Sequence, residues 1–208
     1  MSFTSIYAAN WMEQEGATIA RGLRRRDPGL LDSLIEKYQH RLLRYLVYLT
    51  ANREFAEDLF QETWIRVLER GAQYNGKSRF ETWLFAIARH LVIDSSRRKT
   101  ASSLDALTDP KTNHGAAMQF ASNDLSPFDF ASLSQSGKLM DHALQSLEIA
   151  QREVIVLRFQ EDLALDEIAS ITGAPLSTVK SRLYRGLQAL RPVLEAQKSQ
   201  WVTTGGGA

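Results

Sequence analysis

The side chains best able to do chemistry in this sequence lie between residues 177 and 185. They combine positive charge with hydroxyl groups, and they are Ser177, Thr178, Lys180, Ser181, Arg182, Tyr184 and Arg185. Lysine and arginine pair with phosphate oxygens, and arginine can donate two hydrogen bonds to a guanine edge. The set is therefore suited to holding a phosphate backbone and to reading a base at one or two positions.

Charge is segregated around these residues, although the formal net charge of the chain is only +1. Acidic side chains dominate residues 141–171, whereas basic side chains dominate residues 172–199. This polarity favours docking of the basic part onto phosphates. A second basic cluster, formed by Arg97, Arg98 and Lys99, is compatible with nucleic-acid contact. It is equally compatible with a solvated helix end, where cations interact favourably with the helix dipole.

The basic residues belong to a pattern of helix, tight turn and helix. The apolar face of the first helix comprises Leu165, Ile168, Ala169 and Ile171. Gly173 and Pro175 form the turn, and Ser177 or Thr178 is expected to cap the second helix. The apolar face of that helix comprises Val179, Leu183, Leu187 and Leu190. A basic second helix suits insertion into a DNA major groove, and the alternative interpretation is an ordinary helical hairpin.

A second group of functional candidates lies on an amphipathic helix that begins after a plausible N-cap at Asn52 and ends at Gly71. Its apolar stripe comprises Phe55, Leu59, Phe60, Trp64, Val67 and Leu68. Its opposite face comprises Asp58, Gln61, Glu62, Ile65 and Arg66. This face is either solvated surface with a Glu62–Arg66 ion pair, or a docking surface for a basic partner with Ile65 at its centre.

Helical periodicity over two parts of the chain predicts an all-α fold of two small domains joined by a flexible linker. The first domain covers residues 17–100 and contains about four helices, with starts expected at Asp27-Pro28 and at the Ser78–Glu81 capping box. Residues 101–137 have linker composition, residues 138–198 form the second domain, and residues 199–208 are expected to be a disordered tail. Part of the linker is expected to lie against a partner surface because it contains Phe120, Leu125, Phe128 and Phe130.

The composition excludes several classes of site. The chain has no cysteine, which excludes disulfides, thiolate metal sites and cysteine nucleophiles. The histidines His40, His90, His114 and His142 lack metal-ligand spacing, so no metal or cofactor is expected. No apolar run approaches the roughly 20 residues that span a bilayer, and the N-terminus lacks a secretion-signal pattern. We therefore expect a soluble, cytoplasmic protein without membrane insertion.

Two blocks of sequence resemble the extracytoplasmic-function (ECF) sigma factors, the minimal sigma subunits of bacterial RNA polymerase. Sigma region 2 is similar to REFAEDLFQETWIRVLER followed by SRFETWLFAIARHLVIDSSRRK. Sigma region 4 is similar to LQSLEIAQREVIVLRFQEDLALDEIASITGAPLSTVKSRLYRGLQALR. The resemblance implies a subunit that is not an enzyme, that binds core polymerase, and that recognises the −35 and −10 promoter elements to initiate transcription.

The resemblance also implies roles for individual residues. Asp58, Gln61, Glu62, Ile65 and Arg66 lie where the family binds the clamp helices of the polymerase β′ subunit. Contacts with −10 DNA are implied for Tyr74, Asn75, Lys77, Ser78, Arg89, His90, Asp94, Arg97, Arg98 and Lys99. The loop around Gly76 is implied to capture an extruded base. The residues between 177 and 185 lie where the family reads the −35 element. The implied partners are core polymerase, including its β′ and β subunits, promoter DNA and, as a further possibility, an anti-sigma factor.

The sequence departs from the family pattern in a few places. His90 stands where many members carry Asn, which leaves its part in −10 recognition open. Glu148 replaces a Pro that often opens a region 4 helix, and Ala164 stands where a Ser cap is usual. Both changes are expected to affect helix ends rather than function. Trp64 is expected in the core, whereas Trp83 is expected either in the core or facing the promoter.

Two other classes of protein are alternatives to a sigma factor. A signal-sensing transcription regulator would share the helix-turn-helix, but it needs a ligand pocket or receiver domain upstream, and residues 17–100 have neither pattern. An enzyme would need a catalytic motif, and the sequence has no Walker loop, no G-x-S-x-G and no H-E-x-x-H. Promoter-dependent transcription by the purified chain with core polymerase distinguishes these classes.

Overall fold

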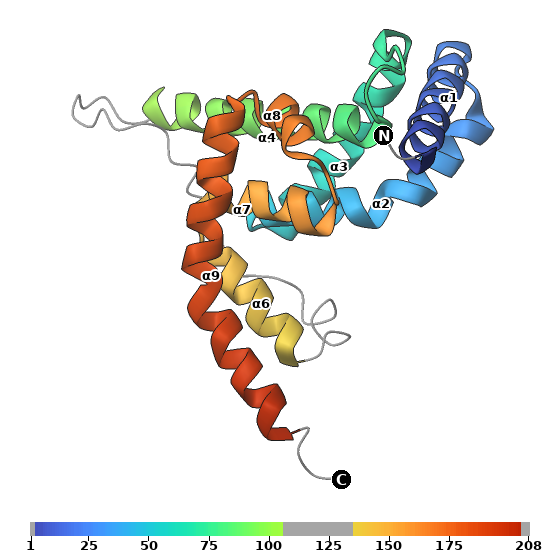
Figure 1. Ribbon diagram of the computed structural model, residues 1–208. Helices are drawn as coiled ribbons and strands as arrows, with labels where there is room; N and C mark the ends of the chain where they lie inside the picture. The colour runs from blue at the N-terminus through green and yellow to red at the C-terminus, as the bar shows by residue number, and fades with distance from the viewer. Residues whose placement is uncertain (1–2, 106–134, 205–208) are drawn as a thin grey trace.

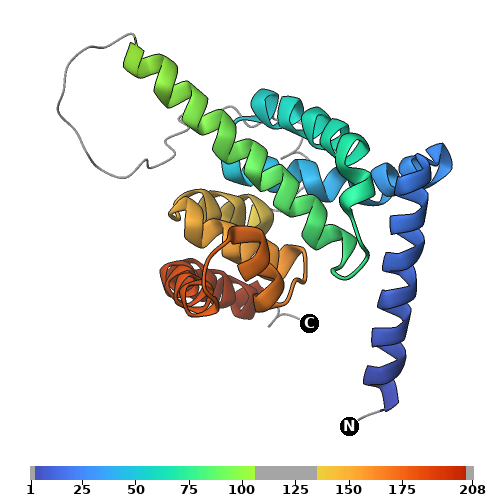
Figure 2. The same ribbon diagram turned by 90° about the horizontal axis from the view of Figure 1, so that it is seen from above.

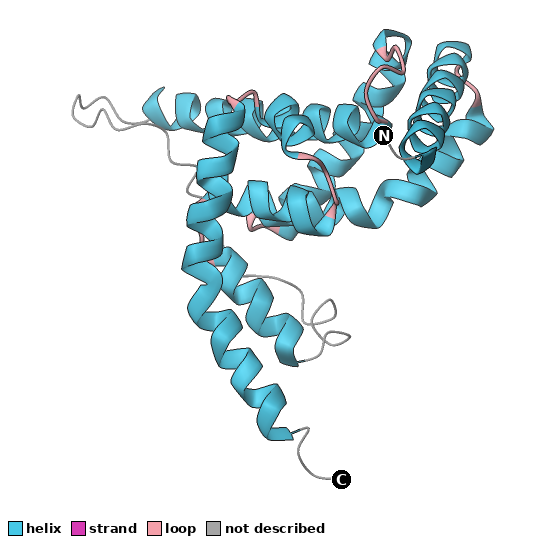
Figure 3. Cartoon of the chain, in the orientation of Figure 1, coloured by secondary structure: helices cyan, strands magenta, loops and turns pink. Residues whose placement is uncertain are grey.

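All the regular secondary structure in the described residues is helical (Figure 3). The computed structural model describes residues 3–105 and 135–204, and these ranges contain no strand. The expected all-α fold is thereby confirmed. The linker residues Phe120, Leu125, Phe128 and Phe130 lie outside the described residues.

The first domain consists of α1 (Phe3–Arg25), α2 (Pro28–Thr50), α3 (Arg53–Arg70), the short 3-10 turn η1 (Gly71–Gln73) and α4 (Phe80–Asp105). The Asp27 carboxylate caps α2 by accepting hydrogen bonds from the N–H groups of Gly29 and Leu30. The Asn52 side chain caps α3 by accepting from the N–H of Phe55 at 2.9 Å. Both expected helix starts are confirmed, because each cap satisfies N–H groups that the first turn leaves without a partner.

The start of α4 departs from the capping box expected at Ser78. The helix begins at Phe80, and the Ser78 carbonyl accepts a hydrogen bond from the Tyr74 hydroxyl at 2.7 Å. The Glu81 carboxylate pairs with the Arg79 guanidinium at 2.6 Å. The sequence therefore located this helix start to within a residue but assigned Glu81 the wrong partner.

The core of the first domain is formed by aromatic and aliphatic side chains of α2 and α4. Its fully enclosed members include Tyr38, Leu42, Tyr45, Leu46, Leu84 and Phe85. The rings of Tyr45 and Phe85 pack edge to face, with centroids 5.0 Å apart. Trp64 is buried as expected. Trp83 is half-buried and packs on Tyr74, with ring centroids 5.3 Å apart.

Leu68 of α3 is a correction to the expected apolar stripe. Its side chain is 45% exposed, and it lies three residues after Ile65, which is 48% exposed. Residues three apart are neighbours on a helix surface, so Leu68 extends the outward apolar patch instead of the core.

The second domain consists of α6 (Gln135–Gln145), α7 (Ile149–Ile155), a π-helical turn η2 (Val156–Gln160), α8 (Leu165–Thr172) and α9 (Leu176–Thr204). Gly173 ends α8 in the left-handed region at φ 63°, where glycine carries no steric penalty. The expected cap at Ser177 or Thr178 is wrong. The helix begins earlier, at Leu176, because the N–H of Val179 already bonds to the carbonyl of Pro175 at 3.0 Å.

The two unusual helix starts of this domain are both accommodated. The N–H of Ala164 donates to the Glu167 carboxylate at 2.9 Å, so the first turn of α8 is closed without a serine. Glu148 takes the N-cap position of α7 without a side-chain capping bond.

Several boundaries differ from those expected. The first helix begins at Phe3, well before residue 17, and α4 continues to Asp105. The second domain begins with α6 at Gln135. Helix α9 continues to Thr204, into the segment from residue 199 that composition predicts to be a disordered tail. Composition alone places such ends poorly, because polar helix ends and linkers use the same residue types.

The two domains pack against each other. Helix α8 lies along α4, and α7 lies against α2 (Figure 1). Helix α1 stands at the side of the first domain, and its N-terminal half projects away from the other helices (Figure 2). Among the described helices, none has the length and apolar character that crossing a membrane requires.

Candidate nucleic-acid and polymerase interface

The first turns of α9 present most of the predicted −35 residues on one accessible face. The exposed members are Ser177, Lys180, Ser181, Tyr184 and Arg185. The Tyr184 side chain is 71% exposed, although it is aromatic. Val179 and Leu190 are buried on the opposite side and hold the helix against its own domain. The accessible face carries two cations and three hydroxyl groups, which together can contact phosphates and base edges.

Thr178 and Arg182 are half-buried and do not share that face fully. Arg182 lies on the side of α9 near α7, where its charge acts on the Glu153 carboxyl. One turn later, a Cβ added to Gly186 would come within 2.5 Å of the Ile155 Cδ1. Gly186 therefore allows α9 to cross α7 closely. Sequence reasoning missed Gly186, although a glycine inside a helical repeat costs about 1 kcal/mol relative to alanine and signals a packing need.

The predicted polymerase-binding face of α3 is accessible to a partner. Asp58 and Gln61 are exposed, and Glu62 is half-buried. Arg66 pairs with Glu62 at 2.9 Å and with Glu69 at 3.2 Å. The expected Glu62–Arg66 pair is thus present. The acidic groups surround an apolar patch formed by Ile65 and Leu68, which is the combination that a mixed polar and apolar docking surface requires.

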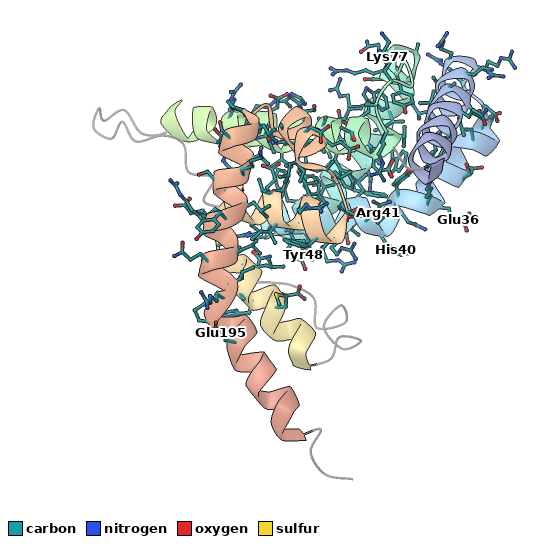
Figure 4. The ribbon with its side chains drawn as sticks, viewed as in Figure 1. Glu36, His40, Arg41, Tyr48, Lys77 and Glu195 are labelled. Carbon is teal, nitrogen blue, oxygen red and sulfur yellow. The ribbon has the colours of Figure 1, made fainter. Side chains whose placement is uncertain are left out.

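The connection between α3 and α4, residues 71–79, carries the first group of predicted −10 residues. Asn75, Lys77 and Ser78 are exposed, and Lys77 lies at the tip of the connection near α1 (Figure 4). The Asn75 side chain accepts a hydrogen bond from the Lys77 N–H at 3.0 Å, which closes a local turn. Tyr74 is only 1% exposed, so in this conformation its side chain is not available to DNA.

The predicted −10 residues on α4 are divided between exposed and covered positions. His90, Asp94, Arg97 and Arg98 are exposed, and His90 Nδ1 lies 2.6 Å from the Ala86 carbonyl oxygen. The side chain of Lys99 lies outside the described residues. Arg89 is the covered member, because the second domain lies over it.

Two buried carboxylates of the second domain take their partners from the first. The Glu161 side chain is fully buried, and it pairs with Arg41 at 2.6 Å and with Arg44 at 3.3 Å. The Glu153 carboxylate accepts hydrogen bonds from Arg89 Nε at 2.8 Å and from the Tyr45 hydroxyl at 3.0 Å. Acidic residues of the segment 141–171 therefore face cations of the first domain.

Further polar contacts join the two domains. The Thr82 hydroxyl donates to the Glu167 carboxylate at 2.9 Å. The Tyr48 hydroxyl donates to Asp141. The buried Arg152 guanidinium donates to the Tyr48 carbonyl oxygen at 2.8 Å. Every one of these bonds joins an element of the first domain to an element of the second.

Burial shifts the pKa values of three groups in this interface. Burial raises the pKa of the Glu153 carboxyl, although Arg89 and the Tyr45 hydroxyl act in the opposite direction. Burial and the nearby Glu153 charge raise the pKa of Tyr45 well above its ordinary value. Burial also lowers the pKa of Arg152. The desolvation of charged groups is the common cause.

Comparison with known proteins places both domains. Residues 34–102 match the family model of Sigma-70 region 2, and residues 138–190 match that of Sigma-70, region 4. The chain is 34% identical to the ECF RNA polymerase sigma factor SigE of Mycolicibacterium smegmatis over 81% of this chain, and it spans 63% of that relative's length. It is 31% identical to the ECF RNA polymerase sigma factor SigX of Bacillus subtilis, over 80% of this chain and 84% of that one.

A solved structure shares the fold. The sigma factor RpoE, in complex with the anti-sigma factor NepR from Bartonella quintana, matches with a TM-score of 0.59 and 24% identity, over 79% of this chain and 96% of that chain. The first domain matches region 2 and the second domain matches region 4. The chain therefore belongs to the ECF family of RNA polymerase sigma factors, in which these two regions mediate promoter recognition and transcription initiation.

Proposed function

We propose that this chain directs core RNA polymerase to promoters through three separate surfaces, acting as an initiation factor and not as an enzyme. The α3 face around Asp58, Gln61 and Glu62 binds the polymerase. Residues 74–79 of the connection between α3 and α4, together with the exposed side of α4, contact the −10 element. The accessible face of α9 contacts the −35 element. The observation that carries the proposal is the α9 face, where Lys180, Ser181 and Arg185 stand exposed directly after a helix-turn-helix turn.

The polymerase contact rests on chemical complementarity. The α3 face carries acid and amide groups around the apolar pair of Ile65 and Leu68. Such a face fits a basic helical surface, and the clamp helices of the β′ subunit are the partner that the family implies. A further contact of the second domain with the β subunit follows from the same family assignment.

The −10 contact rests on the exposed polar residues at the tip of the 71–79 connection. Extrusion of a base from the duplex costs a few kcal/mol, which stacking and base-edge hydrogen bonds in a pocket can offset. Asn75 and Ser78 offer such hydrogen bonds, and Lys77 offers a phosphate contact. Arg97 and Arg98 can hold the adjacent backbone.

An anti-sigma factor is a further partner in this proposal. Two solved structures that share this fold are complexes of sigma factors with such proteins, one with NepR and one with the cytosolic domain of CnrY. We infer that such a partner would keep this chain from core polymerase until it is released. Co-purification of the tagged chain from its own cells, with and without an anti-sigma gene product added in excess, tests this partner.

Run-off transcription tests the proposed function as a whole. Purified chain, purified core polymerase and genomic fragments are combined, and the start sites are mapped. We expect defined transcripts that neither protein makes alone, with common sequence elements near −35 and −10. Random initiation, or no gain over core polymerase, would refute the proposal. Tight sequence-specific binding by the free chain at physiological salt would instead support a transcription regulator.

A further inference from the structure

Between residues 14 and 25, helix α1 has a buried face that meets the 71–79 connection. Its buried residues are Gly16, Ile19, Ala20 and Leu23, which recur at the spacing of one helical side. Contacts between α1 and η1 place this side against the start of the connection. An ion pair between Glu15 and Lys37 at 2.9 Å fastens the same part of α1 to α2.

Two glycines of the connection allow α1 to approach at either end. At Gly76, φ is +75°, and a Cβ added there would lie 2.8 Å from the Gly16 carbonyl carbon and oxygen. A Cβ added to Gly16 would lie 2.5 Å from the Gly76 carbonyl oxygen. At the other end, a Cβ added to Gly71 would lie 3.1 Å from the Leu23 Cβ. The backbones of α1 and of the connection are therefore in direct contact at Gly16 and Gly76.

Hydrogen bonds and ring contacts within the connection tie its residues to one another. The Tyr74 hydroxyl donates to the Ser78 carbonyl at 2.7 Å. The Tyr74 ring packs on Phe80, the first residue of α4, with centroids 5.6 Å apart. A displacement at Gly76 therefore reaches the neighbouring Asn75 and Lys77, because these residues share the same turn.

We propose that α1 is a structural part of the −10 reading surface, and that Gly16 and Gly71 are positioning residues that set where Asn75, Lys77 and Ser78 stand relative to α4. The inference rests on the proposed function of this connection. A binding surface has to be held to within about 0.5 Å of its productive geometry by the residues behind it. Here the residues behind the surface are backbone atoms of α1 at Gly16. A backbone cannot relieve a clash by changing a side-chain rotamer, so the connection itself has to move.

The size of the perturbation can be graded by substitution. Carbon and oxygen atoms in ordinary contact are about 3.5 Å apart, so Gly16→Ala would push the connection away from α1 by about 1 Å. Gly71→Ala would require a shift of only a few tenths of an ångström from its 3.1 Å approach. Gly22→Ala is the matched control on α1, because its Cβ would meet the Leu30 Cδ2, the movable end of a side chain that belongs to α2.

The experiment uses full-length chain in holoenzyme on a promoter fragment from which the parent holoenzyme initiates. A library of that fragment with randomised −10 positions gives the −10 preference profile, and permanganate reactivity of unpaired thymines gives the rate of promoter opening. We expect Gly16→Ala to slow opening by about tenfold or more and to change the −10 profile. We expect Gly71→Ala to produce a smaller change of the same kind, and Gly22→Ala to match the parent.

Core-polymerase affinity and the −35 preference profile are measured on the same variants, and both are expected to be unchanged. If Gly16→Ala fails to fold, as shown by its melting curve, Gly71→Ala carries the test. Parent-like opening and an unchanged −10 profile in the folded variants would overturn the inference while leaving the proposed function intact. Failure of the parent holoenzyme to open any promoter would instead refute the proposed function. A uniform loss of core affinity would also overturn the inference, because it would mark a general folding defect.

Discussion

The Arg89 side chain, on the helix predicted to contact −10 DNA, donates a hydrogen bond from Nε to the buried Glu153 carboxylate of the second domain at 2.8 Å. The second domain therefore covers most of the Arg89 side chain, which is 20% exposed, while the domains are packed together. The −35 and −10 elements are about 25 base pairs apart, which is roughly 85 Å of duplex at 3.4 Å per base pair. We therefore expect the two domains to separate when the chain contacts both elements, and we call the arrangement in this structure, in which they pack together, closed.

The first prediction concerns Glu161, which holds the closed arrangement through Arg41 and Arg44. Replacing its carboxylate by an amide in Glu161→Gln removes two charge-assisted bonds, each of which contributes about 1–3 kcal/mol. We expect the domains to separate more often and the free chain to bind duplex DNA more tightly, with strong salt dependence. Because the chain has no cysteine, dyes on Glu54→Cys and Gln188→Cys report the domain separation by energy transfer.

Asp162→Asn is the matched control for this variant. Asp162 is the next residue, and its side chain is 96% exposed, so its loss should leave energy transfer and DNA binding unchanged. Equal energy transfer in the parent and in Glu161→Gln would show that the Glu161 contacts do not hold the domains together.

The second prediction concerns pH and follows from the raised pKa of Glu153 in the closed chain. The stabilisation of the closed state is fully present below the ordinary Glu pKa of about 4.3. It is lost as the pH rises through the higher pKa of the closed state, because the open state ionises first. We therefore expect energy transfer between the domains to fall as the pH is raised through this window.

Glu153→Gln isolates the contribution of this carboxyl from those of other groups. The amide resembles the protonated acid and can still accept bonds from Arg89 and Tyr45, so the variant should stay closed across the window. Glu81 acts in the opposite direction. Its burial raises its pKa, but hydrogen bonds and the Arg79 charge outweigh burial, so that its pKa is lowered. Protonation of Glu81 at low pH therefore destabilises the fold in both the parent and the Glu153→Gln variant. A parent and variant with the same pH profile would contradict the assignment to Glu153.

The third prediction concerns polymerase docking. Asp58→Ala with Glu62→Ala removes acid groups from the α3 face, and we expect core affinity to fall by about 1 kcal/mol or more per side chain. The melting temperature should barely change, because i,i+4 ion pairs on a helix surface, such as Glu62–Arg66, contribute about 0.3–0.5 kcal/mol. Competition for core polymerase with labelled parent chain measures the affinity.

The matched control for docking is Asp32→Ala with Glu36→Ala, which removes two exposed acids at the same spacing on α2. This double variant should compete as well as the parent. Should the α3 variant compete equally well, the face around Asp58 is solvated surface and not a docking site.

The fourth prediction separates base reading from phosphate holding on α9. Arg185→Ala should cost about 1–3 kcal/mol and relax the preference at one −35 base pair, whereas Lys180→Ala should weaken all promoters alike and lower the salt slope. Arg182→Ala should alter the preference more weakly, because Arg182 is half-buried toward α7. Transcription of a randomised −35 library by each holoenzyme tests these outcomes. Unchanged profiles for both arginine variants would assign −35 specificity to DNA shape.

Local patterns in the sequence were sufficient to predict the helices and the exposed faces of α3 and α9, which make up much of the candidate site. The caps at Asp27 and Asn52 and the turn at Gly173 each depend on a few consecutive residues. The outward position of Ser181 and Arg185 follows from the 3.6-residue period, because every fourth residue returns to the same side. For the same reason, the acid face of α3 could be identified without its surroundings.

The tertiary structure decided which of these faces meet. Glu153 and Glu161 look like solvated acids in an acidic segment, but they are buried against Arg89 and Arg41, which lie far away in the chain. Gly16 and Gly76 are ordinary glycines in the sequence, and only the packing of α1 on the connection reveals their contact. Leu68 fits an apolar stripe by its residue type, yet it faces outward. Helical periodicity specifies one face of one element, whereas burial depends on partners that are distant in sequence and that the period does not encode.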